Sequence, residues 1–167
     1  FRVHRRRDRG IRWAYDHGAR VLSNSWGSPV PSTEIHEAVM DAKSNGAVVL
    51  VSSGNNQGLG VFYPAGFPEA IAVGSSNTCD GPKRVDDQSM VLYGHCTGPE
   101  LSVVAPGVSM VTTDLMGAQG YSPGNYTTNF MGTSSACPVA AGVVALMLSE
   151  HPGLTVDEVR DLLQRTA

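Results

Sequence analysis

A serine lies where the sequence predicts the start of a strongly apolar helix. Residues 132–138 read Gly-Thr-Ser-Ser-Ala-Cys-Pro, and a stretch rich in alanine and valine follows to about Glu150. The hydroxyl of Ser134 would therefore lie among unpaired backbone N–H groups, at the positive end of the helix dipole. That setting stabilises the oxyanion that forms when a serine hydroxyl attacks a carbonyl carbon. Serine is also a common N-cap, so these residues taken alone permit a purely structural role.

A second polar segment follows a predicted buried strand. Residues 51–58 read Val-Ser-Ser-Gly-Asn-Asn-Gln-Gly. Sheets of parallel strands place their sites at the carboxyl ends of the strands. The side-chain amide of Asn55 could donate a hydrogen bond to a developing oxyanion there. Asn55 and Asn56 could equally do no more than accommodate a left-handed turn.

Short apolar runs rich in β-branched residues predict the strands that would position these segments. Three clear runs and two weaker ones lie at Arg20–Asn24, Ala47–Ser52, Ala70–Gly74, Leu101–Ala105 and Ser109–Thr113. A helix over Thr33–Asn45, between the first two strands, makes a strand–helix–strand unit. Such units build parallel sheets, so we predict a single α/β unit.

Three further helices are predicted. One covers Arg9–His17, and one covers Ser134–Glu150 and is apolar on almost every side, which predicts burial all round. The last begins after Thr155, which forms a capping-box pattern with Glu158. By contrast, Asn77–Glu100 is polar and predicted to be irregular.

Composition and charge exclude several classes of function. The 167 residues include 12 basic and 15 acidic side chains, a net charge of −3. Because no basic surface is evident, we expect neither a nucleic acid nor an anionic membrane as a partner. No apolar run approaches the roughly 18–20 residues that span a bilayer, so we also expect no transmembrane segment.

Three cysteines are too few for a disulfide framework. Cys79 and Cys96 flank the irregular segment and could form a bridge, which would close a loop of about 17 residues, or could both be free thiols. We expect Cys137 to pack as a small apolar side chain.

The two polar segments, in this order and at this separation, resemble those of the subtilisin-like serine proteases, the subtilase family. The resemblance covers the chain from about Gly10 to Ala167, with further matches at 23–27, 63–74 and 104–107. It implies that Ser134 is the nucleophile and that Asn55 donates to the oxyanion. It also implies a subtilisin-like three-layer fold, with a mostly parallel sheet and helices on both faces.

The resemblance further implies a set of substrate-binding residues. They form two short segments, consisting of Ser25, Trp26 and Gly27 and of Ser52, Ser53 and Gly54. The polypeptide substrate would pair with the edges of these segments as an extended strand. Ser25–Thr33 and Val51–Phe67 contain no acidic residue, which favours a neutral or apolar side chain before the scissile bond.

The family's catalytic aspartate and histidine motifs are absent from this sequence. We interpret His17 as structural, expect His4, His36 and His95 to be solvated, and place His151 too far along the helix to reach Ser134. We therefore expect residues 1–167 to be the C-terminal two-thirds or so of a subtilase catalytic domain, with the N-terminal part missing and the isolated chain inactive. The alternative is a non-catalytic pseudoprotease or peptide-binding fragment.

The resemblance implies a secreted, extracellular monomer that requires no cofactor. Calcium is common in the family as a structural ion. The backbone carbonyls of Ala65, Phe67 and Ala70 align with a weak cation site of the family.

Overall fold

The structure is a computed structural model that describes residues 4–84 and 93–167. Its main sheet contains four parallel strands in the order β1-β2-β3-β4. They are β1 (Val21–Asn24), β2 (Val48–Ser52), β3 (Ile71–Ser76) and β4 (Leu101–Pro106). All four agree with the predicted strands to within two residues at either end.

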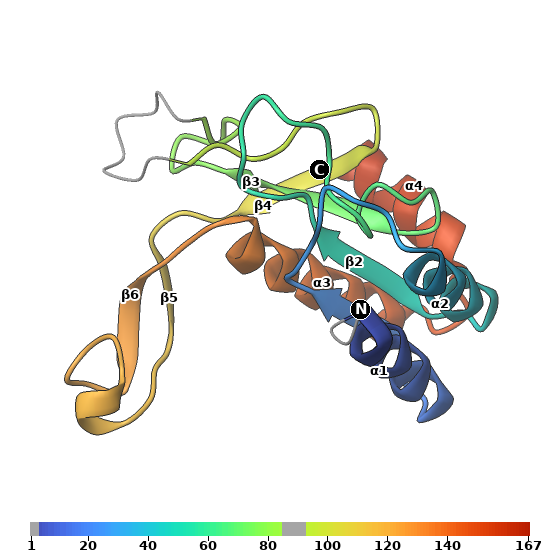
Figure 1. Ribbon diagram of the computed structural model, residues 1–167, viewed down its shortest axis with the longest axis horizontal. Coiled ribbons are helices and arrows are strands. Elements are labelled where there is room, and N and C mark those ends of the chain that lie inside the picture. The colour runs from blue at the N-terminus through green and yellow to red at the C-terminus, as the bar shows by residue number, and fades with distance from the viewer. Residues whose placement is uncertain (1–3, 85–92) are drawn as a thin grey trace.

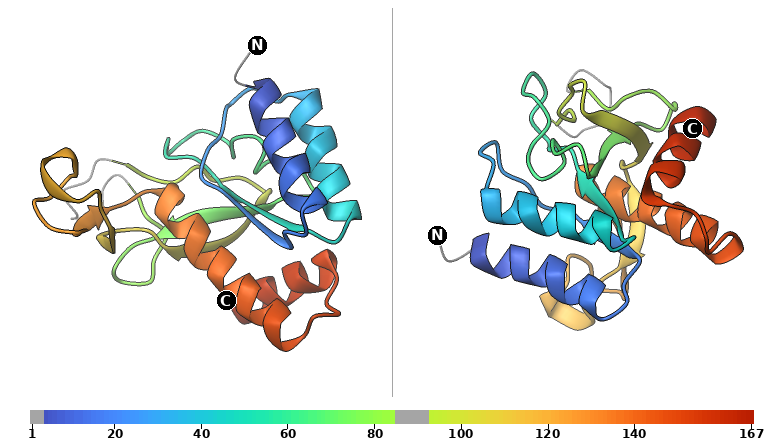
Figure 2. Two further views of the ribbon diagram at one scale, coloured as in Figure 1. Left: turned by 90° about the horizontal axis from the view of Figure 1, so that it is seen from below. Right: turned by 90° about the vertical axis from the view of Figure 1, so that its right-hand side faces the viewer.

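Helices cover both faces of this sheet (Figure 2). The helices α1 (His4–Asp16) and α2 (Thr33–Ser44) lie on one face, and α3 (Thr133–Glu150) and α4 (Val156–Thr166) lie on the other. The result is the three-layer α/β arrangement that the resemblance implies.

Strand β2 shows why this part of the sequence is apolar without a break. Val49 and Val51 belong to the core beneath α1 and α2, whereas Val48 and Leu50 belong to the core beneath α3 and α4. Because successive side chains of a strand point to opposite faces, a strand covered on both sides must be apolar at every position. Every residue of β2 is accordingly buried.

A two-stranded antiparallel hairpin extends away from the body of the molecule (Figure 1). It consists of β5 (Met110–Thr113) and β6 (Tyr126–Phe130), with the short 3₁₀ helix η1 (Gly117–Gln119) near its tip. The predicted strand at Ser109–Thr113 therefore exists, but it belongs to this hairpin and not to the parallel sheet. Neither β6 nor η1 was expected from the sequence.

Helix α3 differs from its prediction. Its inner side packs on the sheet, but Val143 is 45% exposed and Leu146 is 73% exposed. The prediction that this helix is buried all round is therefore wrong, because no other described element covers its outer side. The helix is also long and apolar enough, by length and composition alone, to cross a membrane, with a mean hydropathy of 1.3 over 18 residues, 44% of them buried. The expectation that no apolar stretch approaches that length is wrong for α3, although here its inner side packs on the sheet.

The predicted irregular segment 77–100 lies partly outside the described residues, at 85–92. Its described parts form isolated bridges only, Ser76 with Pro82 and Asn56 with Gly94. The second bridge places this segment beside the loop that follows β2.

Candidate active site

The loop before α3 presents Ser134 at the amino end of the helix. Gly132, with φ 112°, is the N-cap, and it has no side chain with which to cap. Ser134 is therefore the second residue of the helix, and the N-cap interpretation of this serine is wrong. The next serine is different, because Ser135 is buried and its hydroxyl donates to the carbonyls of Gly107 and Gly132 at 3.2 and 2.8 Å.

A proline inside α3 links Ser134 to a second segment. Pro138 has no N–H, so it cannot donate the helical hydrogen bond to the carbonyl of the residue four positions earlier. That carbonyl belongs to Ser134, and it accepts instead from the hydroxyl of Ser25 at 2.8 Å. The hydroxyl of Ser134 in turn lies 3.5 Å from the carbonyl oxygen of Ser25. The segment after β1 is thus fixed directly beside the Ser134 hydroxyl.

Asn55, in the loop after β2, contacts the residue immediately before Ser134. Its side-chain oxygen accepts from both the backbone N–H and the hydroxyl of Thr133, each at 2.9 Å. The hydroxyl of Thr133 also accepts from the backbone N–H of Gly54 at 3.3 Å. These bonds join the loop after β2 to the residue immediately before Ser134. Because the oxygen of the Asn55 amide is occupied, its nitrogen is the group available to donate elsewhere.

The predicted substrate-binding residues differ in their burial and in the backbone N–H groups that they leave unbonded. Ser52 and Ser53 are buried, and within the described residues the Ser53 hydroxyl has no hydrogen-bond partner. The N–H of Ser53 donates to Val73, and that of Gly54 donates to Thr133. These two residues therefore have no N–H left for a substrate strand and can contribute only as a wall.

Trp26 turns toward the other face of the sheet. Its ring packs against the core under α1 and α2, with the Arg7 guanidinium 4.5 Å from the ring centre. Its side chain therefore supports the segment 25–27 from behind, and only its backbone remains on the side of Ser134.

Tyr93 is a site residue that was not expected from the sequence. Its buried hydroxyl donates to the Gly107 carbonyl at 2.8 Å and accepts from the Gly132 N–H at 3.1 Å, with the Ser75 hydroxyl 3.0 Å away. Burial raises the pKa of this phenol, so it stays protonated and keeps its donor. Tyr93 thus ties the ends of β3 and β4 to the N-cap of α3. No motif marks it, because its partners lie 14 to 39 residues away in the sequence.

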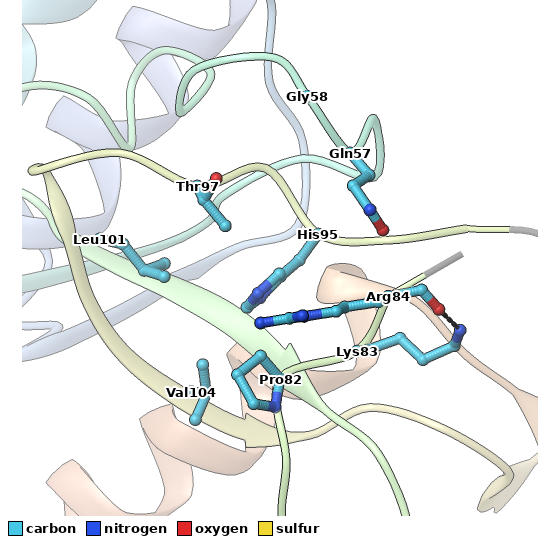
Figure 3. A pocket seen from close by; sticks show the side chains of 9 residues that line it. All are labelled: Gln57, Gly58, Pro82, Lys83, Arg84, His95, Thr97, Leu101 and Val104. Atoms are coloured by element: carbon cyan, nitrogen blue, oxygen red, sulfur yellow. Dashed lines mark hydrogen bonds between the residues drawn. The ribbon is translucent and has the colours of Figure 1, made fainter. Parts of the chain in front are cut away.

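His95, which was expected to be solvated, is buried, and His36 is only partly exposed. His95 is only 3% exposed, and its Nδ1 accepts from the Ser75 N–H at 3.0 Å, while burial and the nearby Arg84 lower its pKa. It lines a cavity of about 460 Å³ beside the loop after β2 (Figure 3). His36 is half-buried, stacks on Phe67 and pairs with Glu69 at 2.9 Å.

The remaining histidines are His17, His151 and His4. The His17 ring bonds to the carbonyl of Trp13, and His151 is exposed just after α3. The His4 side chain lies outside the described part of the chain. No described histidine hydrogen-bonds to Ser134.

All three thiols are free in the structure. Cys79 is exposed, whereas Cys96 and Cys137 are buried, and burial raises the pKa of both buried thiols. The possible bridge between Cys79 and Cys96 is therefore not formed. Cys137 packs in the core beneath α3, as predicted.

Two of the three carbonyls of the expected cation site have other partners. The Ala70 oxygen accepts from the Arg160 guanidinium at 3.0 Å, and the Phe67 oxygen accepts from the Ala70 N–H at 3.0 Å. A guanidinium charge so close to a carbonyl opposes a cation on the same oxygen. The Ala70 carbonyl therefore does not fit a cation site as it is arranged here. Elsewhere in the described residues, no cluster of three or more His, Cys, Asp or Glu side chains could hold a metal ion.

Comparisons with known proteins agree with this arrangement. The model of the Subtilase family matches residues 7–167. Subtilisin of Bacillus pumilus is 39% identical over 162 residues, which are 95% of this chain and 53% of that protein. Subtilisin E of Bacillus subtilis (strain 168) is also 39% identical over 162 residues, 95% of this chain but 38% of that protein.

The fold is also found among solved structures. The solved structure of Sphericase superposes with a TM-score of 0.76 at 26% identity. The match covers 96% of this chain and 54% of the Sphericase chain. The chain thus spans about half, or less, of the length of these relatives.

Proposed function

This chain belongs to the subtilase family, and from that premise we propose that it carries the serine nucleophile and the oxyanion-binding groups of an endopeptidase. The main support for this proposal is one set of contacts. Asn55 and Ser134, which are 79 positions apart in the sequence, are held on one loop junction by the two hydrogen bonds from Thr133 to Asn55. A side-chain amide and a helix N-terminus beside one hydroxyl are two of the groups that acyl transfer uses, and a general base is the third.

The proposed reaction proceeds through an acyl-enzyme. A base removes the proton from the Ser134 hydroxyl while its oxygen bonds to the scissile carbonyl carbon, and the carbonyl electron pair moves to its oxygen. The amide of Asn55 and the backbone N–H of Ser134 hold that oxyanion. The intermediate collapses, the C–N bond breaks, and the leaving amine takes the proton from the base. Water then repeats the sequence and releases the carboxylic acid, so that one water is consumed for each peptide bond cleaved.

We propose that the base and its orienting aspartate come from sequence upstream of Phe1. Their absence from the described residues around Ser134 supports this, as does the greater length of the relatives. His151 follows α3 at its far end, about 25 Å from Ser134 at 1.5 Å per residue, which is too far for proton transfer. Residues 1–167 would then be part of a larger, secreted peptidase domain, and the isolated chain would be inactive.

The peptide substrate would pair with the backbone of Ser25–Gly27, next to the Ser134 hydroxyl. The segment Ser52–Gly54 would face it across the site as a wall, since the N–H groups of Ser53 and Gly54 are already bonded. This refines the expectation that both segments pair with substrate.

A peptidase assay tests this function. The complete protein, meaning this chain with its upstream sequence, should hydrolyse denatured casein, and Ser134→Ala should abolish hydrolysis. Ser149→Ala is the matched control, because it makes the same change at an exposed position near the far end of α3. Hydrolysis that persists in Ser134→Ala would refute the assignment.

A second candidate, a pseudoprotease that binds peptides without cleaving them, is favoured by one observation. No described histidine contacts the Ser134 hydroxyl, so the site as described has no general base. Binding of casein peptides by the complete protein, without hydrolysis, would support this candidate over the first.

A further inference from the structure

The backbone on both sides of Asn55 is held by one residue of a distant segment, Cys96. The Cys96 N–H donates to the carbonyl of Gly54 at 2.9 Å, and the Cys96 thiol donates to the carbonyl of Asn56 at 3.4 Å. These carbonyls belong to the residues immediately before and after Asn55. Cys96 thus fixes the backbone that carries the Asn55 amide, whereas Thr133 fixes the amide itself.

Cys96 also packs directly against Gly54. Gly54 has φ 108°, a conformation that residues other than glycine rarely adopt. A methyl group added there would fall 2.8 Å from Sγ of Cys96 and 3.1 Å from Cγ of Phe62. Cys96 is fully buried, so its sulfur leaves no free space on this side of the backbone. The loop that carries Asn55 therefore cannot shift toward Cys96.

Burial keeps the Cys96 thiol in the form that donates. It raises the pKa of this thiol, which therefore stays protonated at neutral pH and keeps its S–H. The thiol is also free of any disulfide in the structure. The Asn56 carbonyl accepts a second bond, at 3.1 Å, from the N–H of Leu59 within the same loop. The bond from Cys96 is thus the one that ties this carbonyl to another segment of the chain.

The segment that carries Cys96 is itself fixed, and it runs beside the loop after β2 (Figure 3). The His95 ring accepts from the N–H of Ser75 in β3 at 3.0 Å. The Tyr93 hydroxyl accepts from the N–H of Gly132, the N-cap of α3, at 3.1 Å. This segment therefore holds the loop after β2 through Cys96 and the loop before α3 through Tyr93. A support shared by both loops fixes the position of one loop relative to the other.

We propose that Cys96 is a positioning residue for catalysis, which holds the loop after β2 so that the Asn55 amide points at the oxyanion. The inference rests on the proposed function, because it assumes that Asn55 donates to an oxyanion formed at Ser134. It deepens that function by giving a role to a residue that does not touch the substrate. Cys96 acts on the reaction through Asn55, and this distinguishes it from a residue that only stabilises the fold.

A double-mutant cycle on the complete protein tests the proposal, with hydrolysis of a peptide p-nitroanilide as the measurement. Cys96→Ala removes the S–H donor, so kcat should fall by about 10-fold with little change in KM. Cys96→Ser keeps a donor at this position and should recover most of the loss. In Asn55→Ala protein, Cys96→Ala should cause no further fall in kcat, because the amide through which Cys96 acts is already gone.

Cys79→Ala is the matched control, because it makes the same change at an exposed thiol, and it should leave kcat unchanged. If Cys96→Ala does not fold, Cys96→Val replaces it, since valine fills the position without a donor, and the same fall in kcat is expected. Equal losses of kcat with and without the Asn55 amide would overturn the inference. An unchanged kcat in Cys96→Ala, or a loss that Cys96→Ser does not recover, would also overturn it.

Hydrogen–deuterium exchange tests the positioning role without chemistry. The backbone amides of residues 54–59 should exchange faster in Cys96→Ala than in the wild type, and Cys96→Ser should restore the slower exchange. A wild type that hydrolyses no peptide would refute the endopeptidase, and the exchange rates would then test the inference alone. Faster exchange in Cys96→Ala would keep Cys96 as the residue that holds the loop, whereas unchanged exchange would refute that role.

Discussion

The side-chain oxygen of Asn55 accepts two hydrogen bonds from Thr133, one from the backbone N–H and one from the hydroxyl. This double acceptor role fixes the orientation of the amide. Its nitrogen must then face away from Thr133, and it lies near Gly132, where an added methyl group would come within 3.2 Å of it. Asn55 thus reaches the loop before Ser134 as a preorganised donor, and reorienting it during the reaction is unnecessary.

Replacing Asn55 with alanine removes that donor. We predict that kcat of the complete protein falls by about 10²–10³ with little change in KM, the loss known for the equivalent donor of a subtilisin. The adjacent Asn56→Ala serves as the control, because the partners of Asn56 in the structure, Leu59 and Cys96, bond to its backbone carbonyl. Equal losses in both variants would show that the loop, and not the amide, is responsible.

Tyr93→Phe tests the link between the irregular segment and the α3 loop. The variant loses the hydroxyl that bonds to Gly107 and Gly132 but keeps the ring. We predict a loss of about 0.5–1.5 kcal/mol in the free energy of unfolding, the net value of a hydrogen bond, because the Gly132 N–H and the Gly107 carbonyl still bond to each other at 2.9 Å. A fall in kcat without a change in KM should accompany it if the bond positions Ser134. Urea unfolding and steady-state kinetics measure the two effects, and unchanged values of both would show that Tyr93 is only a filler of space.

The sequence predicted those features that depend on neighbouring residues. All four strands of the main sheet follow from apolar runs, and the cap of α4 follows from Thr155 and Glu158, whose side chains do form the reciprocal bonds. Ser134 and Asn55 were identified as candidates from short motifs in the same way. Strand β6 was missed because its sequence, Tyr-Thr-Thr-Asn-Phe, is mostly exposed and has no apolar alternation.

Features that depend on distant residues could not be predicted. The exposed side of α3 is as apolar as the buried side, so only the packing distinguishes them. Tyr93 contacts the site from a segment that folds back on the loop after β2, and it belongs to no periodic pattern. Arg160 reaches the Ala70 carbonyl across 90 positions, which no local rule anticipates.

Thiol counting tests the state of the cysteines. We predict one rapidly reacting thiol in the native protein, that of Cys79, and three in denaturant, because Cys96 and Cys137 are buried. Reaction with an aromatic disulfide reagent, with and without guanidinium, gives both numbers. A single thiol in denaturant would mean that Cys79 and Cys96 are bridged.

The buried His95 predicts a dependence of stability on pH. Burial and Arg84 lower its pKa in the folded state, whereas in the unfolded chain it is about 6.5. Between these two values the unfolded chain binds more protons, so the free energy of unfolding falls as the pH drops below about 6.5. Below the folded pKa the loss levels off. Urea midpoints from pH 8 to pH 5 should show this decline in the wild type and in His17→Gln, which changes an exposed histidine, but a smaller one in His95→Gln. An equal decline in all three would exclude His95 as the cause.

We propose that Ser134 is an activated nucleophile on the loop that Asn55 contacts through Thr133. A fluorophosphonate probe tests this most directly, since it bonds covalently to an activated serine hydroxyl, and mass spectrometry locates the modified residue. We predict labelling of the complete protein at Ser134, loss of labelling in Ser134→Ala, and no efficient labelling of the isolated 167 residues, because we propose that the base comes from sequence upstream of them. Labelling at Ser135, or labelling that persists in Ser134→Ala, would contradict the account.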